Sequence, residues 1–237
     1  MSLNINYYFE HPDKFPVAGF FDGISMTHEI LAKAKSVLSE MLTLPDVKEN
    51  HGTIISGELH LNGNYYIGEG TTIHGDVTII GPVYIGKNCE IMPGAVIRPN
   101  SIIGDNCSVG HGSEVKRGVM FNGSKVASLA FVGDSVLGAS ARIGSGVITA
   151  NRKFDQSVVT LKLNAEKHIL GDAYFGVILG DSSRVGANSI TQPGTHIGPH
   201  TWIFPLTSVR GFIPREKRVY HKQDTVMEEN EIIELAP

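Results

Sequence analysis

The sequence is poor in cysteine, has no excess of positive charge and contains no long apolar run. In 237 residues there are two Cys, and 20 Lys and Arg stand against 24 Asp and Glu, giving a formal net charge of −4 and a pI near 6.2. Nucleic acid is not an expected partner, because binding it calls for a strongly basic surface. No apolar run approaches about 18 residues and no basic stretch with a following apolar one opens the chain, so neither a membrane span nor a signal peptide is predicted. We therefore expect a cytoplasmic protein without a membrane partner.

What the sequence does have is a strict repeat of six residues. Between residues 55 and 121 an apolar residue, most often Ile, recurs at every sixth position: Ile55, Leu61, Ile67, Ile73, Ile79, Ile85, Ile91, Ile97, Ile103, Val109, Val115 and Phe121. A helix repeats its buried face every 3.6 residues and a strand every 2, so neither explains this period. Repeats of this kind predict a solenoid.

We expect each hexad to supply one short strand and one corner of a triangular prism. Three hexads then make a coil of about 18 residues, and residues one coil apart stack as parallel strands. This predicts the columns Leu61, Ile79, Ile97, Val115 and Ile67, Ile85, Ile103, Phe121. Cys89 and Cys107 are also one coil apart. We expect them to be reduced core residues, because a parallel ladder gives the two thiols a poor torsion for a disulfide.

Three segments follow from the repeat. Residues 1–50 lack it and carry an apolar helical stripe from Ile30 to Leu42, which predicts a helix that caps the first coil. Residues 51–209 form the solenoid, and residues 210–237 form a tail, basic at 214–222 and acidic at 227–234.

Two irregularities interrupt the solenoid. The register slips after Phe121, so that residues 122–130 should bulge before Phe131, Leu137, Ile143 and Thr149 resume the spacing. The repeat then stops over residues 151–174, where alternating apolar residues predict a hairpin or arm. Such an excursion from a rigid scaffold is the expected place for a functional site.

Several motifs resemble one enzyme family. They are AVIRPN at 95–100, SEVK at 113–116, SK at 124–125 followed by VGD at 132–134, GSGVITAN at 144–151 and the FD that ends NRKFD at 151–155. In this order they resemble the acetyltransferase half of the bifunctional N-acetylglucosamine-1-phosphate uridyltransferase / glucosamine-1-phosphate acetyltransferases, especially their archaeal-type relatives. The resemblance covers roughly residues 50–215. It implies a left-handed parallel β-helix, a homotrimer, and acetyl-CoA as co-substrate between adjacent prisms.

The resemblance assigns roles to individual residues. Arg98 and Lys116 match the family's phosphate-binding cations, and an Arg fork or an ammonium group suits a sugar phosphate. Asn151 matches an asparagine of the acceptor site. Asp181 and Pro205 lie on the late coils where the family binds coenzyme A, although both are also ordinary turn residues.

The chain departs from the family at four positions of the acceptor pocket. Ser128 stands at the catalytic histidine, Phe131 at a tyrosine, Arg142 at an asparagine and Arg152 at a residue that is tyrosine in the bacterial enzymes. A serine hydroxyl is not basic near neutral pH, whereas general-base help contributes about 10²- to 10⁴-fold to a rate. The two arginines point to an acceptor more anionic than glucosamine 1-phosphate.

Other histidines are candidates for the missing base. His111 lies on an outward corner, and His168 lies in the excursion, where an arm would be able to deliver it to a neighbouring protomer. For each of them a plain surface histidine is the alternative. His196 and His200 invite comparison with zinc enzymes built on the same prism, but such sites need three protein ligands, so we expect no metal.

Two functions remain open. The first is an acyl-CoA-dependent acyltransferase, acetyl-CoA being the expected donor, that acts on a sugar phosphate or sugar nucleotide. The second is a catalytically silent trimer that binds such an anionic sugar and partners a separate nucleotidyltransferase, since this chain has no nucleotide-binding half of its own. The replacements at Ser128 and Phe131 favour the second, and the cations are compatible with both.

Overall fold

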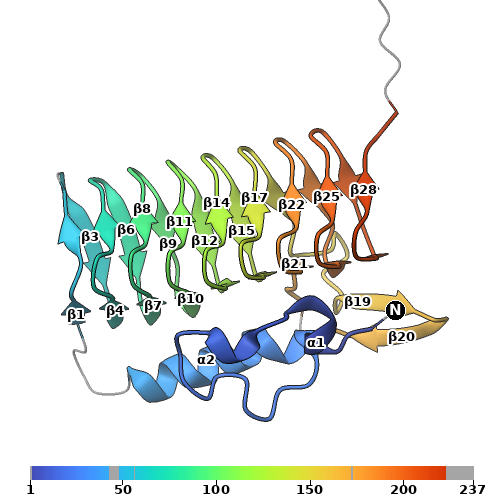
Figure 1. Ribbon diagram of the computed structural model, residues 1–237, viewed down its shortest axis with the longest axis horizontal. Helices are drawn as coiled ribbons and strands as arrows, with labels where there is room; N and C mark the ends of the chain where they lie inside the picture. Colours follow the sequence, from blue (N-terminus) through green and yellow to red (C-terminus); the bar gives the residue numbers. More distant parts are fainter. Residues whose placement is uncertain (1, 43–47, 56, 172, 223–237) are drawn as a thin grey trace, which may run out of the picture.

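The structure is a computed structural model that describes residues 2–42, 48–55, 57–171 and 173–222. It is a parallel β-solenoid of three sheets, preceded by a helical N-terminal segment. Figure 1 shows the coils stacked along the long axis and the N-terminal helices lying along one side. The solenoid predicted from the hexad repeat is therefore confirmed.

Each sheet takes one strand from every coil, and neighbouring strands pair in parallel. Sheet 1 contains β1 (Lys48–Asn50), β4 (Tyr65–Ile67), β7 (Val83–Ile85), β10 (Ser101–Ile103), β13 (Val119–Met120), β16 (Val136–Leu137), β21 (Val177–Leu179), β24 (Thr195–Ile197) and β27 (Phe212–Ile213). Sheet 2 contains β2 (Thr53–Ile54), β5 (Thr72–Ile73), β8 (Glu90–Ile91), β11 (Ser108–Val109), β14 (Lys125–Val126), β17 (Arg142–Ile143), β22 (Arg184–Val185), β25 (Trp202–Ile203) and β28 (Arg218–Val219). Sheet 3 contains β3 (Leu59–Asn62), β6 (Val77–Ile80), β9 (Val96–Ile97), β12 (Glu114–Lys116), β15 (Phe131–Gly133), β18 (Ile148–Thr149), β23 (Ile190–Thr191) and β26 (Ser208–Val209). We call the edges between them the 1/2, 2/3 and 3/1 corners.

The periodic aliphatic residues form the core of the prism. The column Leu61, Ile79, Ile97, Val115 is present as predicted, and its last three members are fully buried. Corners turn through residues with positive φ, such as Asn88 at 53° and Asn106 at 58°, a conformation that Asn tolerates better than most residues. Cys89 and Cys107 are buried and free, as expected. Cys89 Sγ lies 3.0 Å from the carbonyl oxygen of Gly104, and Cys107 Sγ lies 3.1 Å from that of Phe121.

The second predicted column is wrong at its last member. Ile103 pairs with Met120, not Phe121, so this coil has 17 residues. The next coil is equally short, because Met120 pairs with Leu137. Residues 122–130 do not bulge but contain β14, and the inward residue of β15 is Val132 rather than Phe131.

Phe121 points outward because it completes an aromatic cluster with the N-terminal segment. Its ring lies 4.5 Å from Phe9, 5.0 Å from Phe15 and 5.2 Å from Phe21, measured between centroids. Phe121 thus remains buried, as an apolar residue at that position should, but on the opposite side of its strand. Periodicity alone does not distinguish these two forms of burial.

The N-terminal segment contains α1 (Ile5–Tyr8), η1 (Pro12–Lys14), η2 (Thr27–Glu29) and α2 (Ile30–Met41). The predicted helix is present, but it does not cover the first coil, where β1 and β2 are exposed. Its apolar face packs instead on the outward residues of sheet 1, among them Ile102 and Val119. Sheet 1 is therefore buried on both faces at β10 and β13.

The excursion forms the expected hairpin, with β19 (Thr160–Leu163) antiparallel to β20 (Glu166–Ile169). Val159, Leu161 and Leu163 are buried in the same cluster as the N-terminal segment. The hairpin thus packs on its own chain and by itself does not call for a second protomer. The solenoid also continues beyond residue 209, through β27 and β28, so the segment boundary at 210 is wrong. The acidic residues 227–234 lie outside the described residues.

One buried histidine joins the N-terminal segment, the excursion and the solenoid. His196 Nε2 lies 3.0 Å from Thr27 Oγ1, and its Nδ1 lies 3.0 Å from the carbonyl oxygen of Gly194. Its ring stacks on Phe175 at 5.9 Å and meets Tyr8 edge-on at 5.7 Å. Burial lowers the pKa of His196 from 6.5 to about 4.

This lowered pKa predicts a loss of stability in mild acid. Between pH 6.5 and 4 the unfolded chain binds a proton at His196 that the folded chain excludes, so the unfolding free energy falls as the pH falls, by about 2 kcal/mol at pH 5. Urea unfolding at pH 7 and pH 5 should show this loss in the wild type and little of it in His196→Gln. Exposed His200→Gln is the control, and an equal loss in all three proteins would contradict the assignment to His196.

Candidate functional site

A buried carboxylate organises the 3/1 corner. The side chain of Asp134 is fully buried, and its Oδ1 accepts a hydrogen bond from Arg117 Nε while its Oδ2 accepts one from Asn151 Nδ2. Lys116 Nζ lies 3.7 Å from Oδ2. Arg117 and Asp134 both have positive φ, 47° and 49°, at the corners of the two short coils, which places these side chains directly beside one another.

The returning end of the excursion adds an aromatic ring to this corner. Lys116 Nζ lies 4.7 Å from the Tyr174 ring centroid, and the guanidinium carbons of Arg117 and Arg152 lie at 5.6 and 5.2 Å. We call Lys116, Arg117, Asp134, Asn151, Arg152 and Tyr174 the Asp134 cluster. Cations held over the face of one ring are attracted by its quadrupole, and the arrangement offers positive charge to an anionic ligand.

The predicted phosphate pair is only partly assembled. Arg98 lies one coil before Lys116 on the same corner, since its backbone N–H donates to Val115. Its guanidinium, however, binds the Glu114 carboxylate at 2.8 Å, whereas Lys116 belongs to the Asp134 cluster. Asn151 and Arg152, both predicted for the acceptor, lie with Lys116.

Phe131 lies on the outer face of sheet 3. It pairs with Glu114 on one side and Ile148 on the other, and Ile148 and Ile190 continue the row with 39% and 40% of their surface exposed. Sheet 3 therefore presents an apolar row between the 2/3 and 3/1 corners.

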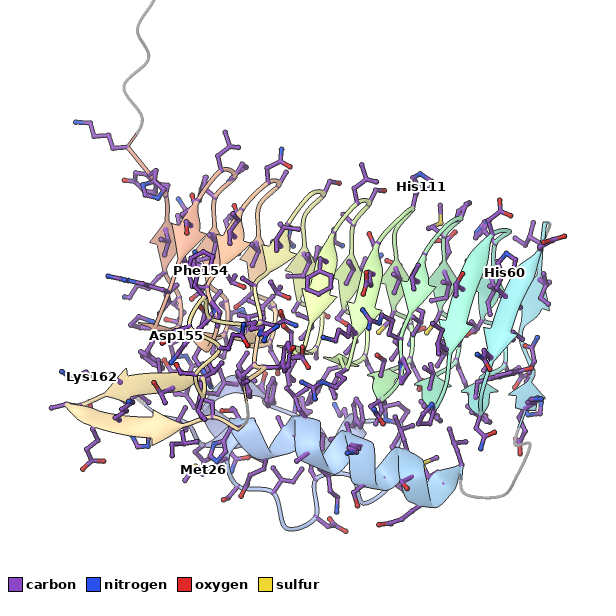
Figure 2. All side chains as sticks on the ribbon, turned by 180° about the vertical axis from the view of Figure 1, so that it is seen from behind. Met26, His60, His111, Phe154, Asp155 and Lys162 are labelled. Carbon is purple, nitrogen blue, oxygen red and sulfur yellow. The ribbon has the colours of Figure 1, made fainter. Side chains whose placement is uncertain are left out.

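Ser128 and His111 share the 2/3 corner, one coil apart. The backbone N–H of Leu129 donates to the His111 carbonyl at 2.8 Å, which fixes this stacking. His111 Nδ1 lies 2.7 Å from the carbonyl oxygen of Pro93. A carbonyl oxygen only accepts, so Nδ1 carries the proton and Nε2 of the neutral ring is left as an acceptor. Figure 2 shows His111 on the edge of the solenoid away from α2 and the hairpin.

His168 is not brought to that corner. It lies on β20, half-buried, with its Nε2 3.9 Å from a Glu166 carboxylate oxygen. It also lies near His28, whose pKa is lowered mainly by burial. The hairpin thus places His168 beside the N-terminal segment.

A concave feature of the described residues runs along sheet 2. We call it the sheet 2 groove; its cavity is about 500 Å³, and it is lined by Ser108, Lys125, Val126, Ala127, Arg142, Ile143, Gly144, Arg184, Val185, Gly186, Trp202, Ile203, Phe204 and Pro205. Lys125, Arg142 and Arg184 are consecutive partners in the strand register, followed by Trp202 and Arg218. The Trp202 ring lies between two guanidinium groups, 5.7 Å from that of Arg184 and 5.5 Å from that of Arg218.

The groove changes the interpretation of three predicted residues. Pro205, predicted for the cofactor, lines it. Arg142, predicted for the acceptor, lies in the groove on the outer face of sheet 2. Asn151, predicted for the same site, lies at the 3/1 corner with Asp134. Asp181 lies at the 1/2 corner, and both its carboxylate oxygens accept backbone N–H groups, from Glu10 at 2.8 Å and Ala139 at 2.7 Å. It therefore holds the N-terminal segment, and mainly burial raises its pKa.

Within the described ranges, no three His, Cys, Asp or Glu side chains lie together as a metal site, and His196 is committed to Thr27 and Gly194. The helices of those ranges are all too short or too polar to span a bilayer.

Sequence reasoning missed Arg117, Asp134, Tyr174 and most of the cationic row on sheet 2. Asp134 belongs to the VGD motif, but its burial depends on the two short coils. Lys125, Arg142, Arg184 and Arg218 are separated by 17, 42 and 34 positions. Only the true coil lengths and the length of the excursion bring them into one row.

A family model described as the GMPPB C-terminal domain matches residues 79–174. Among curated proteins, the bifunctional protein GlmU of Methanococcus aeolicus is 30% identical over 118 residues, which are 50% of this chain and 28% of that protein. The protein of the same name from Methanocaldococcus jannaschii is 28% identical over 117 residues, 49% of this chain and 28% of that protein. The match thus spans little more than a quarter of the length of these relatives.

The solved structures with some similarity to this one include the acetyltransferase domain of PglB from Neisseria gonorrhoeae, with a TM-score of 0.39 and 21% identity. The match covers 62% of this chain and 53% of that one. A mutant of AntD, an N-acyltransferase from Bacillus cereus, has a TM-score of 0.40 and 17% identity, and the match covers 63% of this chain and 75% of that one. From its repeat and its strand pairing the chain is a hexapeptide-repeat β-helix, and parts of it are similar to the GMPPB C-terminal domain and to a part of the Methanococcus aeolicus and Methanocaldococcus jannaschii GlmU proteins.

The buried carboxylate of Asp134 provides a test of the corner. Asp134→Asn removes the charge and turns one acceptor into a donor that faces other donors, so the unfolding free energy should fall by about 2 kcal/mol. Glu114→Gln, which breaks the more exposed pair with Arg98, is the matched control and should cost less than about 1 kcal/mol. Equal losses in urea unfolding would show that Asp134 does not organise the corner.

Proposed function

We propose that the protein is an acyl-CoA-dependent acyltransferase whose acceptor is an amino sugar carrying a phosphate or diphosphate. The single observation that carries this proposal is the sheet 2 groove, where a row of cations and one tryptophan line a long concave face. The relationship to part of a bifunctional GlmU protein supports the reaction class.

The groove suits the shape and charge of coenzyme A. Its lining spans the strands from β11 to β25, four coil spacings or about 19 Å. Arg142 and Arg184 would bind the phosphates, and the adenine would meet the exposed edge of Trp202, because a guanidinium pairs with phosphate and aromatic rings also pack edge-to-face. The thioester would then lie at the Ser108 end.

That end of the groove is close in the chain to His111, which follows Ser108 on the same coil. The amine of the acceptor attacks the thioester carbonyl, a C–N bond forms, and the C–S bond breaks to release the CoA thiolate. His111 Nε2 accepts the proton lost by the amine and returns it to the thiolate. The Pro93 carbonyl supports this role by holding the proton on Nδ1. Ser128 supplies no base.

The acceptor's phosphate would bind at the Asp134 cluster through Lys116 and Arg152, with Asn151 beside them. Sheet 3 separates this cluster from the sheet 2 groove on one prism. We therefore also propose a homotrimer, in which the groove of one protomer faces the 3/1 corner of the next.

A second function is a catalytically silent module that binds the same phosphorylated sugar and partners a separate nucleotidyltransferase. The observation in its favour is that Ser128 and Phe131 replace the residues that the resemblance associates with catalysis. This module would keep the anion site and show no turnover.

Binding of CoA tests the donor site. Calorimetry should detect CoA binding to the wild-type protein, and Arg184→Gln should weaken it about tenfold, since that is the effect of losing about 1.4 kcal/mol from a charged contact. Lys87→Gln, the same charge change at the 1/2 corner, is the control. Absence of binding, or equal affinities in both variants, would count against the groove.

Turnover tests the base. With acetyl-CoA and phosphorylated amino sugars, His111→Asn should lower kcat about 10²- to 10⁴-fold without changing CoA affinity. His60→Asn is the control. If no thiol is released by wild-type protein that binds CoA, the silent module is the better description.

A further inference from the structure

The cationic row on sheet 2 has no acidic partner on the part of the chain that the structure describes. The four side chains are exposed, and no described carboxylate lies within ion-pair distance of any of them: Lys125, Arg142, Arg184 and Arg218. Like charges on neighbouring parallel strands repel one another, so such a row is stabilised by an anion along its length.

The described chain ends beside this row. The Tyr220 ring lies 6.0 Å from Phe204, which lines the groove, and Lys222 is the last described residue. Residues 223–237 follow, long enough to reach about 50 Å when extended. The row from β28 back to β14 covers four coil spacings, about 19 Å.

The composition of residues 223–237 complements the row. The segment has five carboxylates and no Lys, Arg or His, and the carboxylates are Asp224, Glu228, Glu229, Glu231 and Glu234. It also contains apolar residues, among them Met227 and Ile232, that match the apolar wall formed by Trp202 and Phe204.

We infer that the acidic segment 223–237 binds in the sheet 2 groove of its own molecule and competes there with phosphorylated ligands. Tethering gives the segment a high effective concentration, in the millimolar range for short links, so weak contacts suffice. The segment then acts as a built-in competitor that only a ligand of high negative charge displaces. The inference concerns the same groove as the proposed function but depends on the cations alone, not on the identity of the ligand.

Trp202 is the only tryptophan of the chain and stands within the row, so its fluorescence reports the occupancy of the groove. The full-length variant Asp224→Asn, Glu228→Gln, Glu229→Gln, Glu231→Gln, Glu234→Gln keeps the length of the segment and removes its charge. At low salt its Trp202 emission should differ from that of the wild type. The two spectra should converge at about 0.5 M salt, where exposed charges are screened.

A peptide of residues 223–237 added to the neutralised variant should restore the wild-type emission, and a peptide with Asn and Gln at the five positions should not. In CoA titrations the neutralised variant should bind about threefold to tenfold more tightly at low salt, and Arg184→Gln should abolish the difference. If neither protein binds CoA, the proposed function fails, while the fluorescence still decides whether the segment occupies the groove.

Identical emission and salt response in the two proteins would overturn the inference. So would an emission difference that depends on protein concentration, because the segment would then occupy a second copy.

Discussion

Everything on the surface of this protein depends on the stacking of aliphatic side chains inside the prism. Each inward residue contacts its counterparts one coil earlier and one coil later, and burying such a side chain contributes about 1.5–3 kcal/mol. Each column of inward residues is continuous, so a residue inserted or deleted within a strand would break the stacking. Changes in coil length therefore occur at the corners, where the chain leaves the core. The two coils of 17 residues and the excursion after β18 show this: the columns on either side stay in register.

The same constraint gives the three outer faces different roles. Sheet 1 is covered by α2 and the hairpin, and its outward residues from β7 to β21 are apolar. Sheet 2 is open and cationic over its later coils, and sheet 3 is open and apolar at Phe131, Ile148 and Ile190. Since outward residues one coil apart lie about 4.8 Å from each other, a single position repeated along the chain becomes a continuous row. The cations of sheet 2 form such a row.

The sequence predicted the architecture well and the site incompletely, for physical reasons. A six-residue period determines which residues face inward, so the repeat alone assigns Ile79 and Ile97 to the core, where both are fully buried. The same period assigns Phe121 to that core, yet Phe121 is buried by the N-terminal segment, because hydrophobicity does not specify which face is covered. The burial of Asp134 follows from coils one residue shorter than their neighbours, which the repeat does not predict. Tyr174 joins it only because the excursion returns to the same corner.

If sheet 2 binds the acyl donor as we propose, the donor lies in one direction along the solenoid. A crystal structure of the protein with CoA would show that direction. Adenine should lie against Trp202, the phosphates at Arg142 and Arg184, and the sulfur at the Ser108 end beside His111. CoA bound on another face, or with its sulfur at the Trp202 end, would contradict it.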